Sequence, residues 1–181
     1  MADEQALLAA LADIQRRGAI GKVSLPAAVA HADQFVAALP ENAQRLADLG
    51  SGGGLPGLVI AVRRPELAIT MVERRRSRAD LLQRAVRSLR LEHVVVFSGD
   101  VRDLAVTKAH CFDVVTARSF AAPAVTAHWA GELLASGGVL VVSEPPQPTE
   151  ERWSAAVLAA AGLSDLGLLS GIRHFRRVSS P

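Results

Sequence analysis

Apolar positions follow one spacing in the first forty residues and another after them. Over 4–17, apolar residues recur every three or four positions, which predicts a helix ending before two glycines. A second helix is expected over 26–39, with Ser24 as its N-cap. From residue 45 onward, short apolar and β-branched runs alternate with stretches of helical spacing. Strands are expected over 45–49, 68–73, 93–97, 112–117 and 138–143, and helices over 55–64, 77–89, 124–134 and 149–161.

The strand–helix alternation predicts an α/β, Rossmann-like fold. Its sheet is expected to be mostly parallel, with helices on both faces. The last two runs, 163–169 and 173–178, lie around Gly171 and predict a C-terminal antiparallel hairpin. Residues 1–40 are expected to form an N-terminal helical segment on a main domain of residues 41–181, within a single compact unit. Because ligands bind at the carboxyl ends of strands in such sheets, the chemistry is expected there.

The stretch from Asp48 to Gly57, Asp-Leu-Gly-Ser-Gly-Gly-Gly-Leu-Pro-Gly, joins a predicted strand to a predicted helix. Its glycines leave backbone N–H groups open to a ligand, which indicates a site for a nucleoside-bearing cofactor. Two patterns fit this loop. Residues 52–57 match the dinucleotide fingerprint G-x-G-x-x-G, and residues 48–54 match the D-x-G-x-G-x-G pattern of S-adenosylmethionine methyltransferases. Glycine spacing alone does not separate the two cofactors.

Three carboxylates at predicted strand ends favour a cationic cofactor. Asp48 suits the ammonium and sulfonium charges of S-adenosylmethionine and would repel a pyrophosphate. Glu73, about 20 residues after the loop, is placed to accept hydrogen bonds from ribose hydroxyls. Asp100 is placed to bind an adenine amino group, with Val101 against the ring. Structural alternatives stay open: Asp48 as a cap of the loop, Glu73 as an ion-pair partner of the arginines that follow it, and Asp100 as a turn residue.

Composition and charge restrict the partners. Half of the residues are apolar, no apolar run approaches a membrane span, and the start of the chain lacks a basic leader, so a cytoplasmic protein is expected. Net charge is +2, and Lys22 and Lys108 are the only lysines among 20 basic residues. Arginine binds phosphate bidentately, so an RNA partner is permitted. The histidines and the single Cys111 show no metal-ligand spacing, and no metal is expected.

Several motifs resemble the RsmG (GidB) family, class I methyltransferases that act on N7 of a guanine in 16S ribosomal RNA. Leu-Pro-Gly directly after the glycine loop is much more specific than the glycines alone. Thr-Ala-Arg at the end of the run from Phe112 to Ser119 is similar to the family's strand. The turn over 133–139 is also similar, with a looser match at His31. The resemblance covers residues 46 to 142.

The resemblance implies a role for each loop and strand-end residue. Gly50 and Leu55 would line the methionine end of S-adenosyl-L-methionine, with Ser51, Gly52 and Gly54 completing the loop. Glu73 would hold the ribose, and Val101 and Arg102 would contact adenine through their backbone. Arg118 would stand at the mouth shared by cofactor and substrate, as the candidate catalytic residue; its structural alternative is a helix-capping or ion-pairing arginine. No other catalytic residue is assigned.

The implied function is methyl transfer to guanine N7 in 16S ribosomal RNA. The implied partner is ribosomal RNA or the small ribosomal subunit, with no membrane and no DNA partner. The chain departs from the family in its short N-terminal region, at Gln34, and at Ser143-Glu144-Pro145-Pro146 after the fifth strand. A small-molecule methyltransferase, an NAD-binding oxidoreductase and a non-catalytic paralogue that binds cofactor or RNA remain alternatives.

One further motif concerns RNA. The run Arg74-Arg75-Arg76-Ser77-Arg78 begins a predicted helix, where positive charge opposes the helix dipole. A solvated helix face and a phosphate-binding patch are both compatible with such a run. Arg173, Arg176 and Arg177 are expected to extend the patch.

Overall fold

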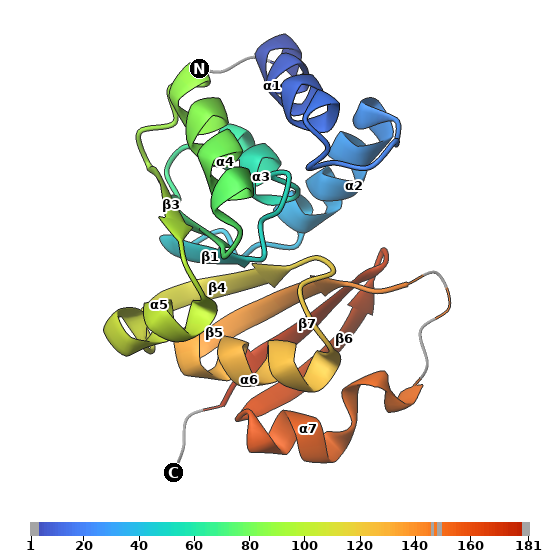
Figure 1. Cartoon of the computed structure of the whole chain (residues 1–181). Helices are drawn as coiled ribbons and strands as arrows, with labels where there is room; N and C mark the ends of the chain where they lie inside the picture. Colours follow the sequence, from blue (N-terminus) through green and yellow to red (C-terminus); the bar gives the residue numbers. More distant parts are fainter. Residues whose placement is uncertain (1–3, 146, 148–149, 179–181) are drawn as a thin grey trace.

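The computed structural model describes residues 4–145, 147 and 150–178 (Figure 1). Seven strands form one sheet in the order β3-β2-β1-β4-β5-β7-β6, parallel except where β7 pairs with β5 and β6. The strands are β1 (Arg45–Leu49), β2 (Ala68–Glu73), β3 (Val94–Ser98), β4 (Phe112–Ala117), β5 (Leu134–Ser143), β6 (Leu163–Leu169) and β7 (Ile172–Arg177). The predicted parallel sheet and C-terminal hairpin are confirmed.

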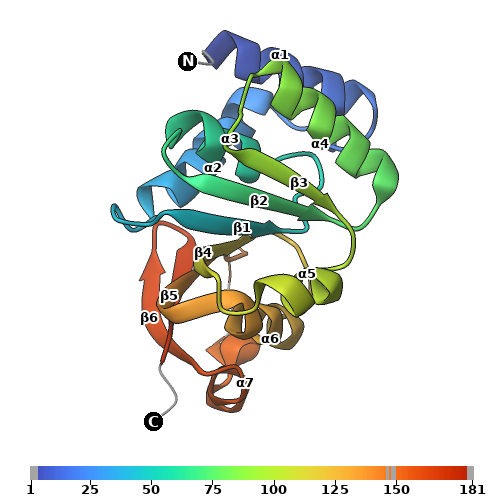
Figure 2. The same ribbon diagram turned by 90° about the vertical axis from the view of Figure 1, so that its left-hand side faces the viewer.

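Helices cover both faces of the sheet in two layers, as Figures 1 and 2 show. One apolar core joins the sheet to the first four helices, and a second core joins it to the last three. The helices are α1 (Glu4–Arg16), α2 (Leu25–Ala37), α3 (Gly57–Arg63), α4 (Arg76–Ser88), α5 (Val101–Lys108), α6 (Pro123–Leu133) and α7 (Ala155–Ala160), with a 3₁₀ turn η1 (Glu150–Trp153). Alternating apolar side chains of the buried strands supply both cores.

The N-terminal helices pack against the sheet's first helical layer. Leu7, Leu11 and Ile14 of α1 are buried in the same core as α4, and Phe35 of α2 is fully buried. Arg63 of α3 pairs with Glu4 and Asp33, which ties α1 and α2 to the main fold. Ser24 caps α2 as predicted. The division at residue 40 stays a prediction. None of the helices in the described ranges has the length and apolar character of a membrane span.

The sheet register places the predicted site residues at one edge. Asp48 of β1 lies beside Thr116 of β4, and Glu73 of β2 lies beside Ser98 of β3. The chain leaves β1 for β2 on one side and returns later to β4 on the other. The strand order therefore reverses between β1 and β4, and a crevice opens at the carboxyl ends of such strands.

Four predicted element boundaries or types are wrong. Helix α5 was not predicted, although Asp100 is its N-cap and accepts from the backbone N–H of Arg102. The predicted helix over 55–64 begins only at Gly57, after a cis Leu55–Pro56 bond. Strand β5 begins at Leu134 rather than 138. The helix predicted over 149–161 is divided, because Ser154 caps the start of α7 after the 3₁₀ turn; Thr149 lies outside the described residues.

Candidate functional site

Three backbone N–H groups of the glycine loop donate hydrogen bonds to acceptors within the protein. The N–H of Ser51 donates to Val72 O (3.0 Å), that of Gly52 to the Glu73 carboxylate (3.0 Å), and that of Gly54 to Ser51 O (2.7 Å). A loop that holds a pyrophosphate needs such donors turned toward the ligand. The N–H groups of Ser51, Gly52 and Gly54 are therefore not turned toward a ligand phosphate.

Close packing explains two of the loop's glycines. Gly50 has a positive φ of 64°, and a Cβ there would lie 2.8 Å from a ring carbon of Phe120. A Cβ on Gly53 would lie 2.8 Å from Ala19 O and closer still to Ile20. The loop is therefore held between the segment after α1 and the segment after β4, and side chains on these two glycines would displace it.

Glu73 joins the loop to the start of the next helix. One carboxylate oxygen accepts from Gly52 N–H, and the other accepts from Arg75 N–H at 2.7 Å. The residue is only 5% exposed, yet it lines a cavity of about 630 Å³. A carboxylate has about four lone-pair sites, so each oxygen retains acceptor capacity for a hydroxyl in the cavity. The predicted pairing with neighbouring arginine side chains is not what fixes it, since the contact from Arg75 is through backbone.

The cavity beside Glu73, here called the first cavity, contains most of the predicted nucleoside site. Gly50, Glu73, Asp100, Val101 and Arg102 line it. The cavity is also lined by residues that sequence reasoning did not assign to the site: Val72, Arg74, Arg75, Arg78, Gly99, Ser119, Phe120, Ala121, Val125 and Trp129. A lining that combines polar groups with aromatic and aliphatic side chains is suited to a purine nucleoside.

Asp100 and Arg102 form a unit of their own. The Arg102 guanidinium lies 3.0 Å from Asp100 Oδ1 through Nε, and the backbone N–H of Arg102 donates to the same oxygen. These hydrogen bonds hold the pKa of Asp100 below its usual range. The structure thus places both residues at the first cavity, and it also shows that Asp100 has a structural role as the cap of α5.

Asp48 lies beneath the loop and is not among the described residues that line the two larger cavities at this edge. It is 1% exposed; Thr116 Oγ1 donates to its Oδ1 at 2.8 Å, while Oδ2 lacks a hydrogen-bond partner among the described atoms. A Cβ on Gly57 would come within 2.6 Å of that oxygen. Burial raises the pKa of the Asp48 carboxyl to about 6. The predicted direct contact of Asp48 with the cofactor stays untested, and its position favours support of the loop.

A second cavity of about 360 Å³ adjoins the first and shares Gly50 with it. Ser51, Gly52, Leu55 and Arg118 line it, so the remaining predicted residues lie here, except Gly54, which lines neither. The other lining residues are Ala19, His31, Gly53, Arg78, Ser119, Ser143 and Glu144. Gly53 belongs to the glycine loop, whereas Ala19, His31, Ser143 and Glu144 are distant from the loop in sequence and are brought to it by tertiary packing.

Arg118 is a half-buried cation that lines the second cavity together with Arg78. Burial lowers its pKa and the charge of Asp48 opposes that shift, while no described atom accepts a hydrogen bond from its guanidinium. The next residue, Ser119, has a positive φ of 54° and lines both cavities. Backbone strain of this kind concentrates at functional sites. The alternative of an ion-pairing or capping arginine finds no partner in the described residues.

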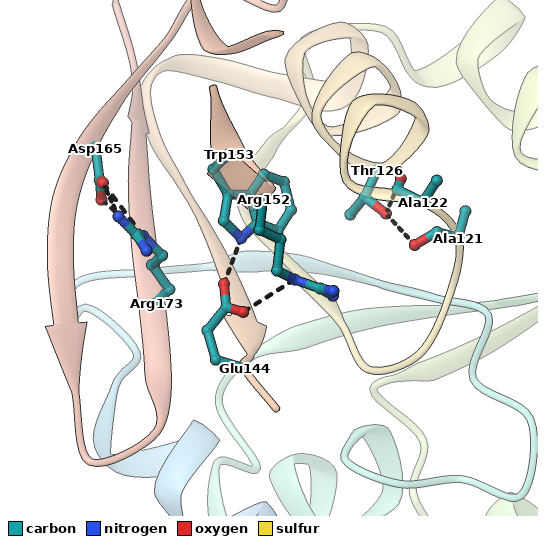
Figure 3. A network of polar contacts seen from close by, with 8 residues as sticks. All are labelled: Ala121, Ala122, Thr126, Glu144, Arg152, Trp153, Asp165 and Arg173. Carbon is teal, nitrogen blue, oxygen red and sulfur yellow. Dashed lines mark hydrogen bonds and ion pairs between the residues drawn. The ribbon is translucent and has the colours of Figure 1, made fainter. Parts of the chain in front are cut away.

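A buried carboxylate fixes the segment after β5 (Figure 3). The Glu144 side chain is 1% exposed; it accepts from the Trp153 indole N–H and lies 3.0 Å from Arg152 Nε. Trp153 packs on Phe175 of β7, with ring centroids 4.7 Å apart. Thr126 meanwhile donates to the carbonyls of Ala121 and Ala122 and so holds the loop before α6. Trp153 therefore packs in the core from a 3₁₀ turn.

No group of three or more histidine, cysteine or acidic side chains within the described residues is arranged to hold a metal ion. Cys111 is half-buried, and its thiol contacts Ala109 O.

This sheet, with β7 antiparallel between β5 and β6, is the class I methyltransferase fold. Solved structures with the same fold include cofactor-bound Rv0187 from MTB (TM-score 0.70, 20% identity, 98% of this chain and 92% of the other). An O-methyltransferase from Bacillus cereus in complex with SAH is similar (TM-score 0.68, 15% identity, 98% and 92%). At these identities the likeness shows the fold alone.

The family is shown by sequence. Residues 30–158 match the family model GidB, described as rRNA small subunit methyltransferase G. The chain therefore belongs to this family, and the resemblance predicted from its motifs is confirmed. Over 106 residues it is 44% identical to ribosomal RNA small subunit methyltransferase G of Acidiphilium cryptum, an alignment covering 59% of this chain and 47% of that protein. The chain spans about half the length of the curated relatives it matches.

Proposed function

We propose that this chain transfers a methyl group from S-adenosyl-L-methionine to N7 of a guanine in 16S ribosomal RNA. The observation that carries the proposal is the position of Glu73 at the wall of the first cavity, together with three N–H groups of the glycine loop that donate within the protein rather than toward a phosphate. Every predicted site residue lies within the stretch that matches the family. The small ribosomal subunit is the proposed partner, and the cytoplasm the proposed location.

The residues present fit this cofactor. Glu73 would accept hydrogen bonds from the ribose hydroxyls, and Val101 and Phe120 would contact adenine. Gly50 and Leu55 would line the methionine end of the cofactor near the second cavity. Asp48 would act from beneath, stabilising the loop and adding negative potential under a cationic ligand. Bound there, S-adenosyl-L-methionine supplies an electrophilic methyl group.

The chain's own contribution to the chemistry is positioning. Guanine N7 has a lone pair and no proton to lose, so methylation there needs no general base. The protein must hold the acceptor in line with the methyl group, which orientation can supply. Arg118 lines the second cavity, and no described atom accepts a hydrogen bond from its guanidinium. Guanine O6, beside N7, is an acceptor that arginine binds in nucleic acids. Because the product gains positive charge, a nearby carboxylate such as buried Asp48 offsets part of the repulsion from Arg118.

The test is methyl transfer to small ribosomal subunits prepared from cells that lack this protein. With labelled cofactor, the wild type should label one guanine of 16S RNA, located by nuclease digestion and mass mapping. Glu73→Ala should lower labelling through cofactor affinity, while Asp165→Asn, far from both cavities on β6, should not.

Other outcomes would identify the alternatives. Binding of cofactor with no label on RNA, but label on small molecules of a cell extract, would favour a small-molecule methyltransferase. Cofactor binding with no transfer to either would favour a non-catalytic paralogue. Binding of NAD in place of S-adenosyl-L-methionine would overturn the cofactor assignment.

A further inference from the structure

The positive charge of the chain is concentrated in one short stretch. Residues 74–90 contain seven arginines and one acidic residue, Asp80. Thirteen of the twenty basic residues and seventeen of the eighteen acidic residues lie elsewhere, so the rest of the chain carries a net charge of −4. The overall charge of +2 is therefore the sum of a strongly basic segment and a remainder of the chain that is net negative. Such a segment attracts polyanions at long range.

Part of this segment forms a row of exposed arginines along helix α4. Arg76, Arg84 and Arg87 are exposed and recur at helical spacing on one side of α4, with Asp80 among them. The buried residues Ala79, Leu82 and Ala85 lie on the opposite side. Arg76, Arg84 and Arg87 are called the α4 arginine track below. Figure 2 shows α4 at the outer surface beside α1, running away from the carboxyl ends of β2 and β3.

The arginines of this stretch differ from most of the other arginines in that they lack a carboxylate partner among the described residues. Arg16, Arg17, Arg63, Arg64, Arg102, Arg152 and Arg173 each form an ion pair with a carboxylate. Among the described residues, no arginine of 74–90 does so. The first turn of α4 also lacks an acidic residue, and Arg75 provides no side-chain cap. Positive charge that opposes the helix dipole without internal compensation favours an external anion.

The track is continuous with the site. Arg74, Arg75 and Arg78, which immediately precede or open α4, line the first cavity, and Arg78 also lines the second. The C-terminal arginines do not join this surface, so the prediction that they extend the patch is wrong. They lie on β7, separated from β2 by three strands, and Arg173 is paired with Asp165 there.

We infer that the α4 arginine track is a docking surface for the sugar–phosphate backbone of the acceptor RNA. The inference rests on the proposed function in taking RNA as the acceptor. From Arg76 to Arg87 the helix rises about 16 Å at 1.5 Å per residue, which is long enough to contact more than one phosphate. Phosphate contacts of this kind fix the register of a nucleic acid without reading its sequence. The track would thus orient the RNA while the second cavity takes one base.

The experiment compares two charge-matched double variants. Arg84→Gln with Arg87→Gln removes two arginines of the track and leaves the cavity residues intact. Arg45→Gln with Arg176→Gln removes two exposed arginines at other parts of the sheet, outside both cavities. Binding of each protein to small ribosomal subunits is measured over a series of salt concentrations, and binding of S-adenosylhomocysteine and the melting temperature are measured alongside.

The track variant should bind subunits about 10-fold more weakly at low salt, and the slope of log affinity against log salt should fall by roughly 1.4–1.8 for two lost phosphate contacts. Its affinity for S-adenosylhomocysteine and its methylation rate at saturating subunits should stay near wild type. The control should keep both affinity and slope.

The outcomes separate the two proposals. A wild type that methylates subunits, with a track variant as tight and as salt-dependent as the wild type, would overturn the docking surface and leave the function standing. A wild type that binds cofactor but neither binds nor methylates subunits would overturn the function, and with it the choice of RNA. Equal weakening of both variants would show a nonspecific charge effect and would also overturn the docking surface.

Discussion

The two cavities meet at Gly50, but they are built differently. The first cavity takes its polar residues from the ends of neighbouring parallel strands, β2 and β3, and from the turn after each. The second cavity draws His31 from α2, Arg118 from the end of β4, and Glu144 from the segment after β5. The sheet register positions the polar strand-end residues of the first cavity. It also brings the ends of β1, β4 and β5 together at the second cavity, but His31 reaches that cavity only through the packing of α2.

The difference indicates a division of labour. Under the proposed function, the cofactor would be held by strand ends, which the sheet itself positions rigidly. The acceptor side would be formed in part by loops and by a helix outside the βαβ units, where substitutions can change the ligand without disturbing the sheet. This chain departs from the family motifs at Gln34 and from Ser143 onward. Gln34 lies on α2, the helix that supplies His31, and Ser143 lines the second cavity.

The largest effect is expected from Gly50→Val, which should disable both cavities. A β-branched side chain is strained at a φ of 64°, and its Cβ would displace Phe120. Affinity for S-adenosylhomocysteine should fall by about 100-fold or more, with unfolding destabilised by about 2–3 kcal/mol. Gly137→Val is the control, because Gly137 has a φ of 75° with open space around it. Equal loss of cofactor affinity in both variants would contradict a local blocking effect.

Glu73→Ala should affect the first cavity more than the second. It leaves the N–H groups of Gly52 and Arg75 without their acceptor and removes the ribose ligand. Cofactor affinity measured by calorimetry should fall about 30- to 100-fold, since charge-assisted hydrogen bonds contribute about 1.5–3 kcal/mol each. Affinity for ribosomal subunits should change less than twofold. Glu73→Gln, which keeps one acceptor oxygen, should lose less.

Arg118→Lys should affect the second cavity alone. A lysine keeps the charge but lacks the planar fork that binds a base edge or carboxylate. The kcat/KM for ribosomal subunits should fall about 10-fold, and cofactor affinity should stay within about threefold. If cofactor affinity falls as far as kcat/KM does, Arg118 belongs to the cofactor site and the functional boundary between the cavities is wrong.

Asp48→Asn should change the pH dependence of stability more than it changes binding. Since the folded pKa of about 6 lies above the 3.8 of an aspartate exposed to water, this carboxyl contributes stability below about pH 4 that is lost as the pH rises through 6. Relative to the variant, the wild type should lose about 2 kcal/mol of unfolding free energy between pH 4 and pH 7. Urea unfolding at several pH values measures this. A tenfold or greater loss of cofactor affinity would instead place Asp48 in contact with the cofactor.

In both cavities the sequence predicted the loop and strand-end residues and missed the residues that packing brings in, for a physical reason. Strand ends, glycine spacing and the distance to Glu73 are local patterns, and a parallel sheet brings them to one edge. Helix α5 escaped prediction because Asp100, interpreted as a ligand, is also the cap that begins it. No sequence motif includes Phe120, Trp129 or Ser119. Gly50 is an indirect sign of Phe120, because a Cβ at position 50 would collide with the Phe120 ring.

The placement of the aromatic residues has a practical consequence for watching the molecule at work. The chain has two tryptophans and no tyrosine. Trp129 lines the first cavity, while Trp153 is hydrogen-bonded to Glu144, a residue of the second. The intrinsic fluorescence of each tryptophan should therefore report on a different cavity. In a Trp153→Phe protein the emission follows cofactor binding, and in a Trp129→Phe protein it follows arrival of the acceptor, so their order can be timed by stopped flow without any attached dye.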